Sequence, residues 1–256
     1  MGGVEYQITV GKKDSRIRPS INISHYVEEF GEDLDRIAHE ILDTAMEHQN
    51  VEGFNPEDML NKEYMLDKAV VQLVNKERNQ EALTTRGAVT FDFLNLTAVI
   101  RIKALVGNST GTFIATKQMC ENADLDVVEL IEAAKENTGK NVCWIGLKQV
   151  MEDAGEDTSG MPDVMTIGTN GDRSFGASIM MFSEKFRELS ESLYSDLWII
   201  PSSVHEIIAV PMNEIPYEAL APMVAEVNRS CVDPVEVLTD TVYKYEHETG
   251  KVSVAA

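Results

Sequence analysis

Four polar residues at the junction of two apolar runs could carry chemistry. Ser202, Ser203, His205 and Glu206 lie together between the stretches DLWIIP and IIAVP. A serine within hydrogen-bond reach of a histidine, with a carboxylate behind it, is the arrangement of a nucleophile, a general base and an orienting acid. Residues two apart on a strand point the same way, so Ser203 and His205 could meet. One hypothesis is therefore a hydrolase that uses Ser203 and His205.

The same residues also have a structural interpretation. No strained Gly-x-Ser-x-Gly turn surrounds Ser203, and the stretch PSSV offers no obvious oxyanion hole. A Pro-Ser-Ser turn, in which hydroxyls accept from backbone N–H groups and His205 bonds a neighbour, requires no catalysis. The sequence favours the turn and keeps catalysis as the alternative.

Three asparagines, together with Ser202, are weaker candidates for binding. Asn75 and Asn79 are four residues apart in an expected helix and so share a face. Because asparagine is mildly unfavourable inside a helix, we expect both to bond backbone at a strand edge or loop rather than a ligand. Asn170 precedes Gly171 between two apolar runs, a pattern typical of a β-hairpin.

Metal and cofactor motifs are not found in the sequence. The five histidines are dispersed, and Cys120, Cys143 and Cys231 are far apart with no CxxC spacing. Neither GxGxxG nor GxxxxGK[ST] occurs, so no phosphate cradle is indicated. We therefore expect no metal and no cofactor, and unpaired thiols that are typical of the cytoplasm.

Composition limits the partners. The chain has 256 residues, 43% of them hydrophobic, which is enough for one large core or two modest ones. Its formal net charge is −21, and residues 151–256 carry six Lys/Arg against 19 Asp/Glu. Such a charge argues against direct binding of nucleic acid or of an anionic membrane surface. No signal peptide or membrane-length apolar run is present, which favours a cytoplasmic protein. The oligomeric state stays open.

Hydrophobic periodicity predicts the elements that position these residues. In the first half of the chain we expect a strand hairpin over 4–10 and 17–23, a helix over 28–49, a helical segment in two pieces over 56–81, a meander of antiparallel strands over 89–104 and 112–116, and helices over 124–136 and 145–151. In the second half we expect a hairpin over 164–169 and 174–181, a helix over 183–194, two buried strands over 197–200 and 207–210, and a helix over 219–227. A turn or short helix over 233–238 and an exposed charged end follow. Gly176 and Ala177 leave little side-chain bulk, so something should pack close to the backbone there.

These elements predict an α+β fold in which antiparallel β-sheets, covered by amphipathic helices, form two β-rich layers. The loop 152–163 is rich in acidic residues, Gly, Ser and Pro, which makes it the expected joint. The predicted division is an N-terminal α+β part, 1–151, and a C-terminal α+β part, 164–256. One continuous domain is the alternative.

Several stretches, taken in order, resemble a bacterial family of unknown function numbered 5688. They are LVNKERN, the pair TN at 169–170, FGAS at 175–178, DLWIIPSSVHEIIAVP at 196–211, EVN at 226–228 and EVLTDTVYKY at 236–245. The block PSSVHE, Pro201–Glu206, is the specific part. The resemblance implies an α+β protein of anaerobic bacteria, often encoded near mobile elements, whose members usually begin with a helix before the first strand. It implies no activity, substrate or catalytic residue.

The leading functional hypothesis is a non-enzymatic cytoplasmic protein-interaction module with an acidic surface. It is motivated by the lack of a convincing catalytic set and by the charge of residues 151–256. A hydrolase using Ser203 and His205 is one alternative. The other is an acidic mimic of nucleic acid that inhibits a basic partner protein.

Overall fold

The structure, a computed structural model, describes residues 7–9, 20–31, 33–48, 55–106, 109–160, 163–201, 203–232 and 236–255. The chain divides into two compact units, Met1–Met59 with Ala104–Gly111 and Leu60–Lys103 with Thr112–Ala256. Among the described residues, no helix combines the length and the apolar character needed to cross a membrane.

The smaller unit contains a two-stranded sheet and a pair of helices. Its elements are β1 (Gln7–Thr9), β2 (Ser20–Asn22), α1 (Ser24–Phe30) and α2 (Leu34–His48). The predicted hairpin is confirmed, because Ile8 pairs with Ile21 in antiparallel register. The single helix predicted over 28–49 is two helices. Gly31 follows α1 with φ 60°, a left-handed conformation that glycine adopts readily, and this ends the first helix.

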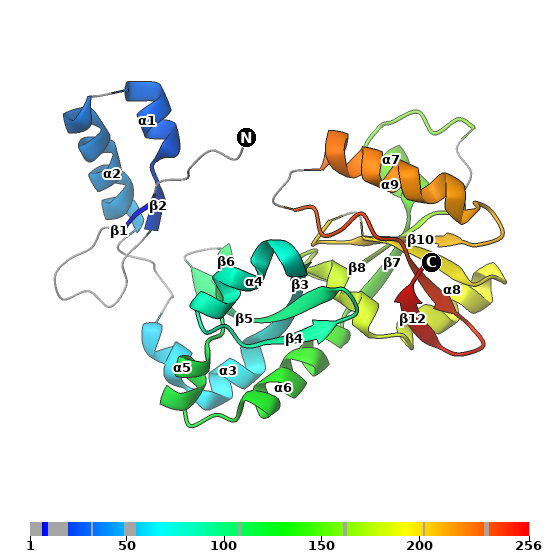
Figure 1. Cartoon of the computed structure of the whole chain (residues 1–256), viewed down its shortest axis with the longest axis horizontal. Coiled ribbons are helices and arrows are strands. Elements are labelled where there is room, and N and C mark those ends of the chain that lie inside the picture. The colour runs from blue at the N-terminus through cyan, green and yellow to red at the C-terminus, as the bar shows by residue number, and fades with distance from the viewer. Residues whose placement is uncertain are drawn as a thin grey trace. The chain divides into compact units, whose positions relative to one another are not determined.

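The larger unit holds two antiparallel sheets, and the first has four strands in the order β3-β5-β4, with β6 also paired to β5. Before it comes η1 (Pro56–Leu60), most of which belongs to the smaller unit. The sheet and its helices are α3 (Lys62–Lys68), β3 (Ala69–Asn75), α4 (Lys76–Thr85), β4 (Thr90–Phe93), β5 (Leu96–Val106), β6 (Ser109–Ile114), α5 (Lys117–Asn122) and α6 (Val127–Gly139), of which residues 104–106 and 109–111 are assigned to the smaller unit. Figure 1 shows α3 and α6 side by side next to β3. Leu83 of α4 packs on Val99 of β5. The predicted meander is confirmed.

The helical segment predicted over 56–81 is wrong in its middle, where β3 lies. Val70, Val71 and Val74 are β-branched and favour an extended backbone. Asn61 and Asn75 cap the helices before and after the strand, each accepting a hydrogen bond from a backbone N–H three residues on, at 3.0 Å. The caps set where the helices begin, and the valines fill the strand between them.

The second sheet has six strands in the order β12-β11-β9-β10-β8-β7. Its elements are β7 (Val142–Gly146), α7 (Leu147–Asp153), β8 (Thr166–Asn170), η2 (Gly176–Met181), α8 (Lys185–Leu193), β9 (Leu197–Ile200), β10 (Ile207–Pro211), α9 (Tyr217–Cys231), β11 (Tyr243–Glu246) and β12 (Lys251–Val254). The strands β9 and β10 are central, as predicted. Phe186 of α8 stacks on Tyr245 of β11, and Leu220 of α9 packs with Val210 of β10. The residues of β9 that face these helices alternate, so α8 and α9 cover opposite faces of the sheet (Figure 1).

These two sheets and their helices confirm the α+β class, but the hairpin predicted at Asn170-Gly171 is wrong. The strand β8 pairs with β7 and β10, and the residues after it form the 3₁₀ helix η2. The Asn170 side chain closes the loop, because its Oδ1 accepts from Ser174 N (3.0 Å) and its Nδ2 donates to Ser174 O (2.6 Å). Arg173 and Phe175 have left-handed φ values of 50° and 60°, which turn the chain away from a second strand.

The end of the chain also differs from its prediction. Instead of an exposed tail, β11 and β12 form the edge hairpin of the six-stranded sheet, with Tyr243 and Tyr245 fully buried. The turn or short helix predicted over 233–238 falls partly on 233–235, which lie outside the described residues. The strands on either side of the loop 152–163, β7 and β8, pair directly with each other.

Candidate functional site

The block Pro201–Glu206 forms the connection between β9 and β10. Ser202 lies outside the described residues. Ser203 Oγ accepts a hydrogen bond from the backbone N–H of His205 (3.0 Å), and Ser203 N donates to Glu206 O (3.4 Å). This is a turn closed by a serine hydroxyl, and it uses the hydroxyl on backbone rather than on the imidazole. Glu206 is half-buried at its end.

The imidazole of His205 is held by Phe175 and Glu236. Its Nδ1 accepts from the backbone N–H of Phe175 (3.3 Å), and the two rings stack with centroids 6.0 Å apart. Its Nε2 lies 3.7 Å from Glu236 Oε1. Because Nδ1 accepts, the ring proton belongs on Nε2, where it faces the carboxylate. Neither nitrogen is left to take a proton from Ser203, so the two residues come together in sequence but not as a catalytic pair.

Gly176, at the start of η2, lies so close to the backbone of this turn that no side chain fits there. A Cβ on Gly176 would lie 2.2 Å from His205 O and 2.3 Å from Thr169 Oγ1, far inside contact distance. Thr169 Oγ1 donates to the same His205 carbonyl (2.9 Å), and Ala177 N donates to Val204 O (3.3 Å). The close approach predicted at Gly176 is confirmed, and the segment that approaches it is the turn at Pro201–Glu206.

The candidate asparagines occupy the seam between the two sheets. Asn75 Nδ2 donates to Leu238 O (3.1 Å), and Asn79 Nδ2 donates to Asn75 O (2.9 Å). Two residues before Leu238, Glu236 O accepts from Val204 N (3.0 Å). These bonds connect Asn75 and Asn79 with the turn that carries His205, and Phe175 connects the turn with the Asn170 loop. The candidate residues that the structure describes thus belong to one hydrogen-bonded seam, in which their side chains bond mainly to backbone groups.

Arg101 of β5 belongs to this seam and was not singled out in the sequence. Its Cζ lies 5.3 Å from the Phe175 ring centroid, so the Phe175 ring contacts both a guanidinium and the imidazole of His205. Its Nε donates to Thr112 Oγ1 (2.9 Å) and its Nη1 to Gln72 Oε1 (3.1 Å). Burial lowers the pKa of Arg101 below its usual value. A charged residue inside the apolar run AVIRIKAL is the signal that could have found it.

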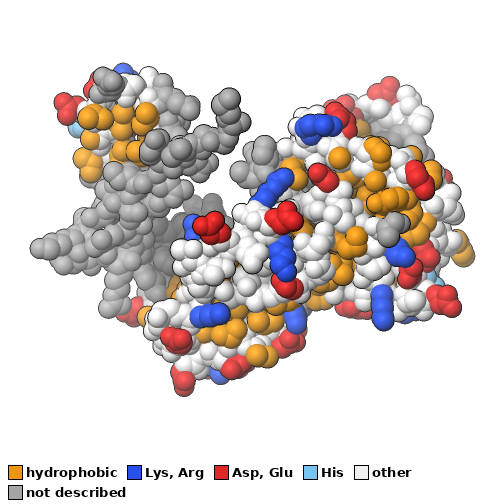
Figure 2. Space-filling model, viewed as in Figure 1, with side chains coloured by type: hydrophobic (Ala, Val, Ile, Leu, Met, Phe, Trp, Pro, Cys, Tyr) orange, Lys and Arg blue, Asp and Glu red, His pale blue; other side chains and the backbone are white. Residues whose placement is uncertain are grey.

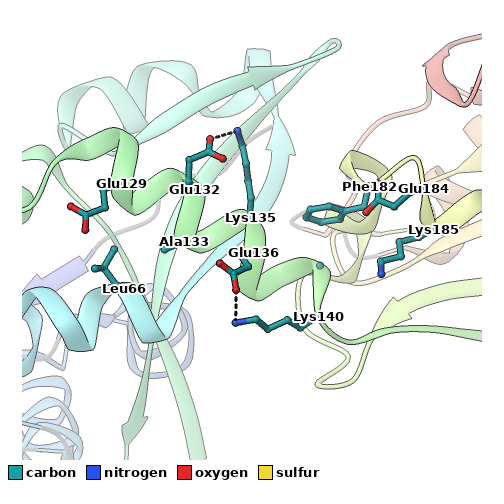
Figure 3. A pocket seen from close by; sticks show the side chains of 11 residues that line it. Leu66, Glu129, Glu132, Ala133, Lys135, Glu136, Lys140, Phe182, Glu184 and Lys185 are labelled. Carbon is teal, nitrogen blue, oxygen red and sulfur yellow. Dashed lines mark hydrogen bonds and ion pairs between the residues drawn. The ribbon is translucent and has the colours of Figure 1, made fainter.

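A separate open hollow of about 820 Å³ lies beside α6 (Figure 3). Along α6, Lys135 pairs with Glu132 (2.9 Å) and Lys140 with Glu136 (3.3 Å), and Phe182 faces them from the other side. Because these charges neutralise each other within one helix and are largely exposed, they provide little net field for a charged ligand. Within the described ranges, no group of three or more His, Cys, Asp or Glu side chains could hold a metal ion.

A sequence profile of a family described as Family of unknown function (DUF5688) matches residues 3–247. The chain belongs to this family. The predicted resemblance is therefore confirmed over nearly the whole length of the chain. No curated protein and no solved structure matches it. Membership in DUF5688 brings no activity with it, so a function must be argued from the surface of this chain.

Proposed function

We propose that this chain is a protein-interaction module that binds a basic partner through the acidic surface of residues 151–256. The observation that carries the proposal is a stripe of carboxylates along α8. Glu184, Glu188 and Glu191 are all exposed and recur at spacings of four and three, so they share one face of the helix, on which the exposed Arg187 is a single cation. The stripe ends beside Tyr194, whose side chain is 92% exposed. Exposed aromatic rings are typical of binding surfaces.

The acidic excess is not uniform. Figure 2 shows carboxylates mixed with Lys and Arg side chains and with apolar side chains on the visible face. Elsewhere in residues 151–256, carboxylates are paired locally, as in Lys244 with Glu246 (2.7 Å) and Arg229 with Glu226. The stripe on α8 therefore supports recognition of a partner better than the total charge does, since total charge also serves solubility.

The alternatives have less support. A hydrolase would need Ser203 and His205 to share a proton, whereas both are engaged with backbone. Mimicry of nucleic acid is a special case of the present proposal, in which the basic partner would also bind nucleic acid. In the proposal the module acts in the cytoplasm of a bacterium, in keeping with its widely spaced cysteines and its family resemblance.

The test uses the full chain, immobilised, to capture proteins from an extract of the host cell at low and at physiological salt. A variant with Glu184→Gln, Glu188→Gln and Glu191→Gln removes the stripe. A control with Glu63→Gln, Glu77→Gln and Glu81→Gln, three exposed carboxylates of α3 and α4, reaches the same net charge.

We expect a basic protein to bind wild type and the control, and to be lost from the stripe variant and from wild type at high salt. Equal capture by the two variants, or no salt-sensitive partner at all, contradicts the proposal. Addition of duplex DNA tests the nucleic-acid mimic, because DNA should then displace the captured partner from the chain.

A further inference from the structure

A small hollow of about 290 Å³ lies beside α4, over β4 and β5 of the four-stranded sheet. All the residues that line it belong to the larger unit. Leu83 and Ala88, which pack together in the core below α4, form its apolar lining. The polar lining comes from α4, β4, β5 and the start of α5, and it includes Lys76, Gln80, Thr90, Asp92, Thr97 and Lys117.

Thr97 of β5 brings a buried hydroxyl to this hollow. Only 8% of the residue is exposed, and its hydroxyl forms no hydrogen bond with any residue that the structure describes. In that part of the chain, the unpartnered side-chain atoms that are closed to solvent are Tyr245 Oη and His247 Nδ1. The Thr97 hydroxyl is not one of them, so it is open to the hollow that the residue lines. Because buried hydroxyls are rarely left unpaired, this one indicates a place for an acceptor from outside.

The register of the sheet explains why Thr97 has no partner within the fold. Directly opposite it are Val74 of β3, which has no polar side-chain atom, and Asp92 of β4. The Asp92 carboxylate is paired instead with Lys76, whose Nζ lies 2.8 Å from its Oδ2. This ion pair leaves the hydroxyl of Thr97 as a donor that faces the hollow.

Lys117, the first residue of α5, supplies a cation to the same hollow. Its side chain is exposed, and it forms no ion pair with the residues that the structure describes. Its backbone N–H donates to Gly87 O (2.9 Å), which holds the start of α5 beside the hollow. Glu121, which lines a neighbouring hollow with Lys117, accepts from Gln118 Nε2 (3.1 Å). The ammonium group of Lys117 is therefore free to bind an anion.

We propose that this hollow binds the carboxylate group of a small organic acid. The three charged residues of its lining sum to one positive charge, in a chain of net charge −21, which matches a carboxylate better than a phosphate dianion. A carboxylate accepts several hydrogen bonds, so one such group can bond both the Thr97 hydroxyl and the Lys117 ammonium group. Asp92 can accept from a hydroxyl group of the same molecule.

This inference does not rest on the proposed function. The stripe on α8 and the hollow beside α4 have no residue in common. A partner protein on the stripe and an acid in the hollow are therefore separate binding events, and the failure of one leaves the other standing.

The test titrates the full chain, labelled with ¹⁵N, with sodium lactate at constant ionic strength. Lactamide is the matched control, because it has nearly the same shape and no charge, and inorganic phosphate is the competing class of anion. We expect saturable shifts of the backbone N–H signals of Ala88, Thr97 and Lys117 with lactate, and affinity about tenfold weaker or worse with lactamide. No saturable shift with lactate, equal effects of lactamide, tighter binding of phosphate, or shifts elsewhere only, overturns the proposal.

Three variants test the assigned groups. Thr97→Val removes the hydroxyl and nearly keeps the shape of the side chain, so it should weaken lactate binding about tenfold. Because that hydroxyl has no partner in the free protein, the melting temperature should not fall. Lys117→Gln should also weaken binding about tenfold. Lys251→Gln, at an exposed lysine of β12 outside the lining, should leave it unchanged.

Two results with these variants contradict the site. Equal weakening by Lys117→Gln and Lys251→Gln means general charge attraction and overturns the proposal. Wild-type affinity in Thr97→Val overturns it as well, because the hydroxyl then bonds only water.

Discussion

Gly176 is the residue at which a single substitution can test how closely the seam is packed. Replacing it with alanine places a methyl group against the His205 carbonyl and Thr169, neither of which is a flexible side-chain end. Overpacking of this kind costs about 1–3 kcal/mol. We expect Gly176→Ala to lower the melting temperature by about 2–4 °C for each kcal/mol in a chain of this size. Thermal unfolding followed by circular dichroism measures it.

Gly171→Ala is the matched control, because its Cβ would meet only Asn141 Cβ at 3.6 Å, an ordinary contact. If Gly176→Ala has the same melting temperature as the control, the turn at His205 can move to make room for the methyl group.

At the residue scale, the sequence predicted a close approach at Gly176, because glycine has no side chain. Its partner was not predictable, since His205 lies 29 positions further along the chain and only the fold brings its carbonyl close to Gly176.

The strand β3 is an edge strand whose outward backbone groups are paired by side-chain hydroxyls instead of a further strand. Ser178 Oγ donates to Val71 O (2.8 Å) and accepts from Leu73 N (3.2 Å). Thr138 Oγ1 accepts from Val71 N (2.9 Å). Both hydroxyl residues are buried. Such pairing satisfies the edge and closes it to other strands.

Ser178→Ala leaves two buried backbone groups without a partner, each worth about 1–3 kcal/mol. We expect the free energy of unfolding in urea to fall by an amount in that range or above it, with an unchanged m-value. Thr84→Ala removes an exposed hydroxyl that donates to Gln80 O (2.7 Å) and should change stability by no more than about 0.5 kcal/mol. If Ser178→Ala changes stability as little as Thr84→Ala, water has replaced the Ser178 hydroxyl as the partner of Val71 O and Leu73 N.

Elements with strong periodicity were predictable, and short ones beside turns were not. The runs that became β9, β10 and α8 are apolar or one-sided over their whole length, so local pattern and burial agree. The segment that became β3 lies between two capped helices, and its hydroxyl partners come from α6 and η2, far along the chain. Likewise the pattern over 174–181 predicts a strand where η2 lies, because nothing local shows that Ser178 must reach β3.

At the scale of the whole molecule, composition and alternation predicted two sheets covered by helices, and the sequence could not say how the sheets join. The larger unit joins them with polar side chains. Asn95, in the turn between β4 and β5 of the four-stranded sheet, donates from Nδ2 to Thr241 Oγ1 (3.0 Å). Its Oδ1 accepts from Tyr243 Oη of the other sheet (2.5 Å). These partners are almost 150 residues apart, beyond the reach of any local pattern.

This junction gives the larger unit a dependence on alkaline pH. Burial raises the pKa of Tyr243 far above its usual value of about 10. Above about pH 10 the unfolded chain loses this proton while the folded chain keeps it, so the unfolded state binds fewer protons. The stability that Tyr243 contributes is therefore complete below pH 10 and is lost as the pH rises towards the raised pKa. Buried Tyr245 acts in the same direction.

We expect the melting temperature of wild type to fall from about pH 9 to pH 11 at fixed ionic strength, and that of Tyr243→Phe to fall less steeply. At pH 7 the same variant should be less stable by about 0.5–1.5 kcal/mol, because its bond to Asn95 is gone. Tyr194→Phe, at a ring that is 92% exposed, should keep the wild-type slope. If the melting temperature of Tyr243→Phe falls with pH as steeply as that of wild type, Tyr243 ionises equally in the folded and the unfolded state. The contact between Tyr243 and Asn95 must then open before the protein unfolds.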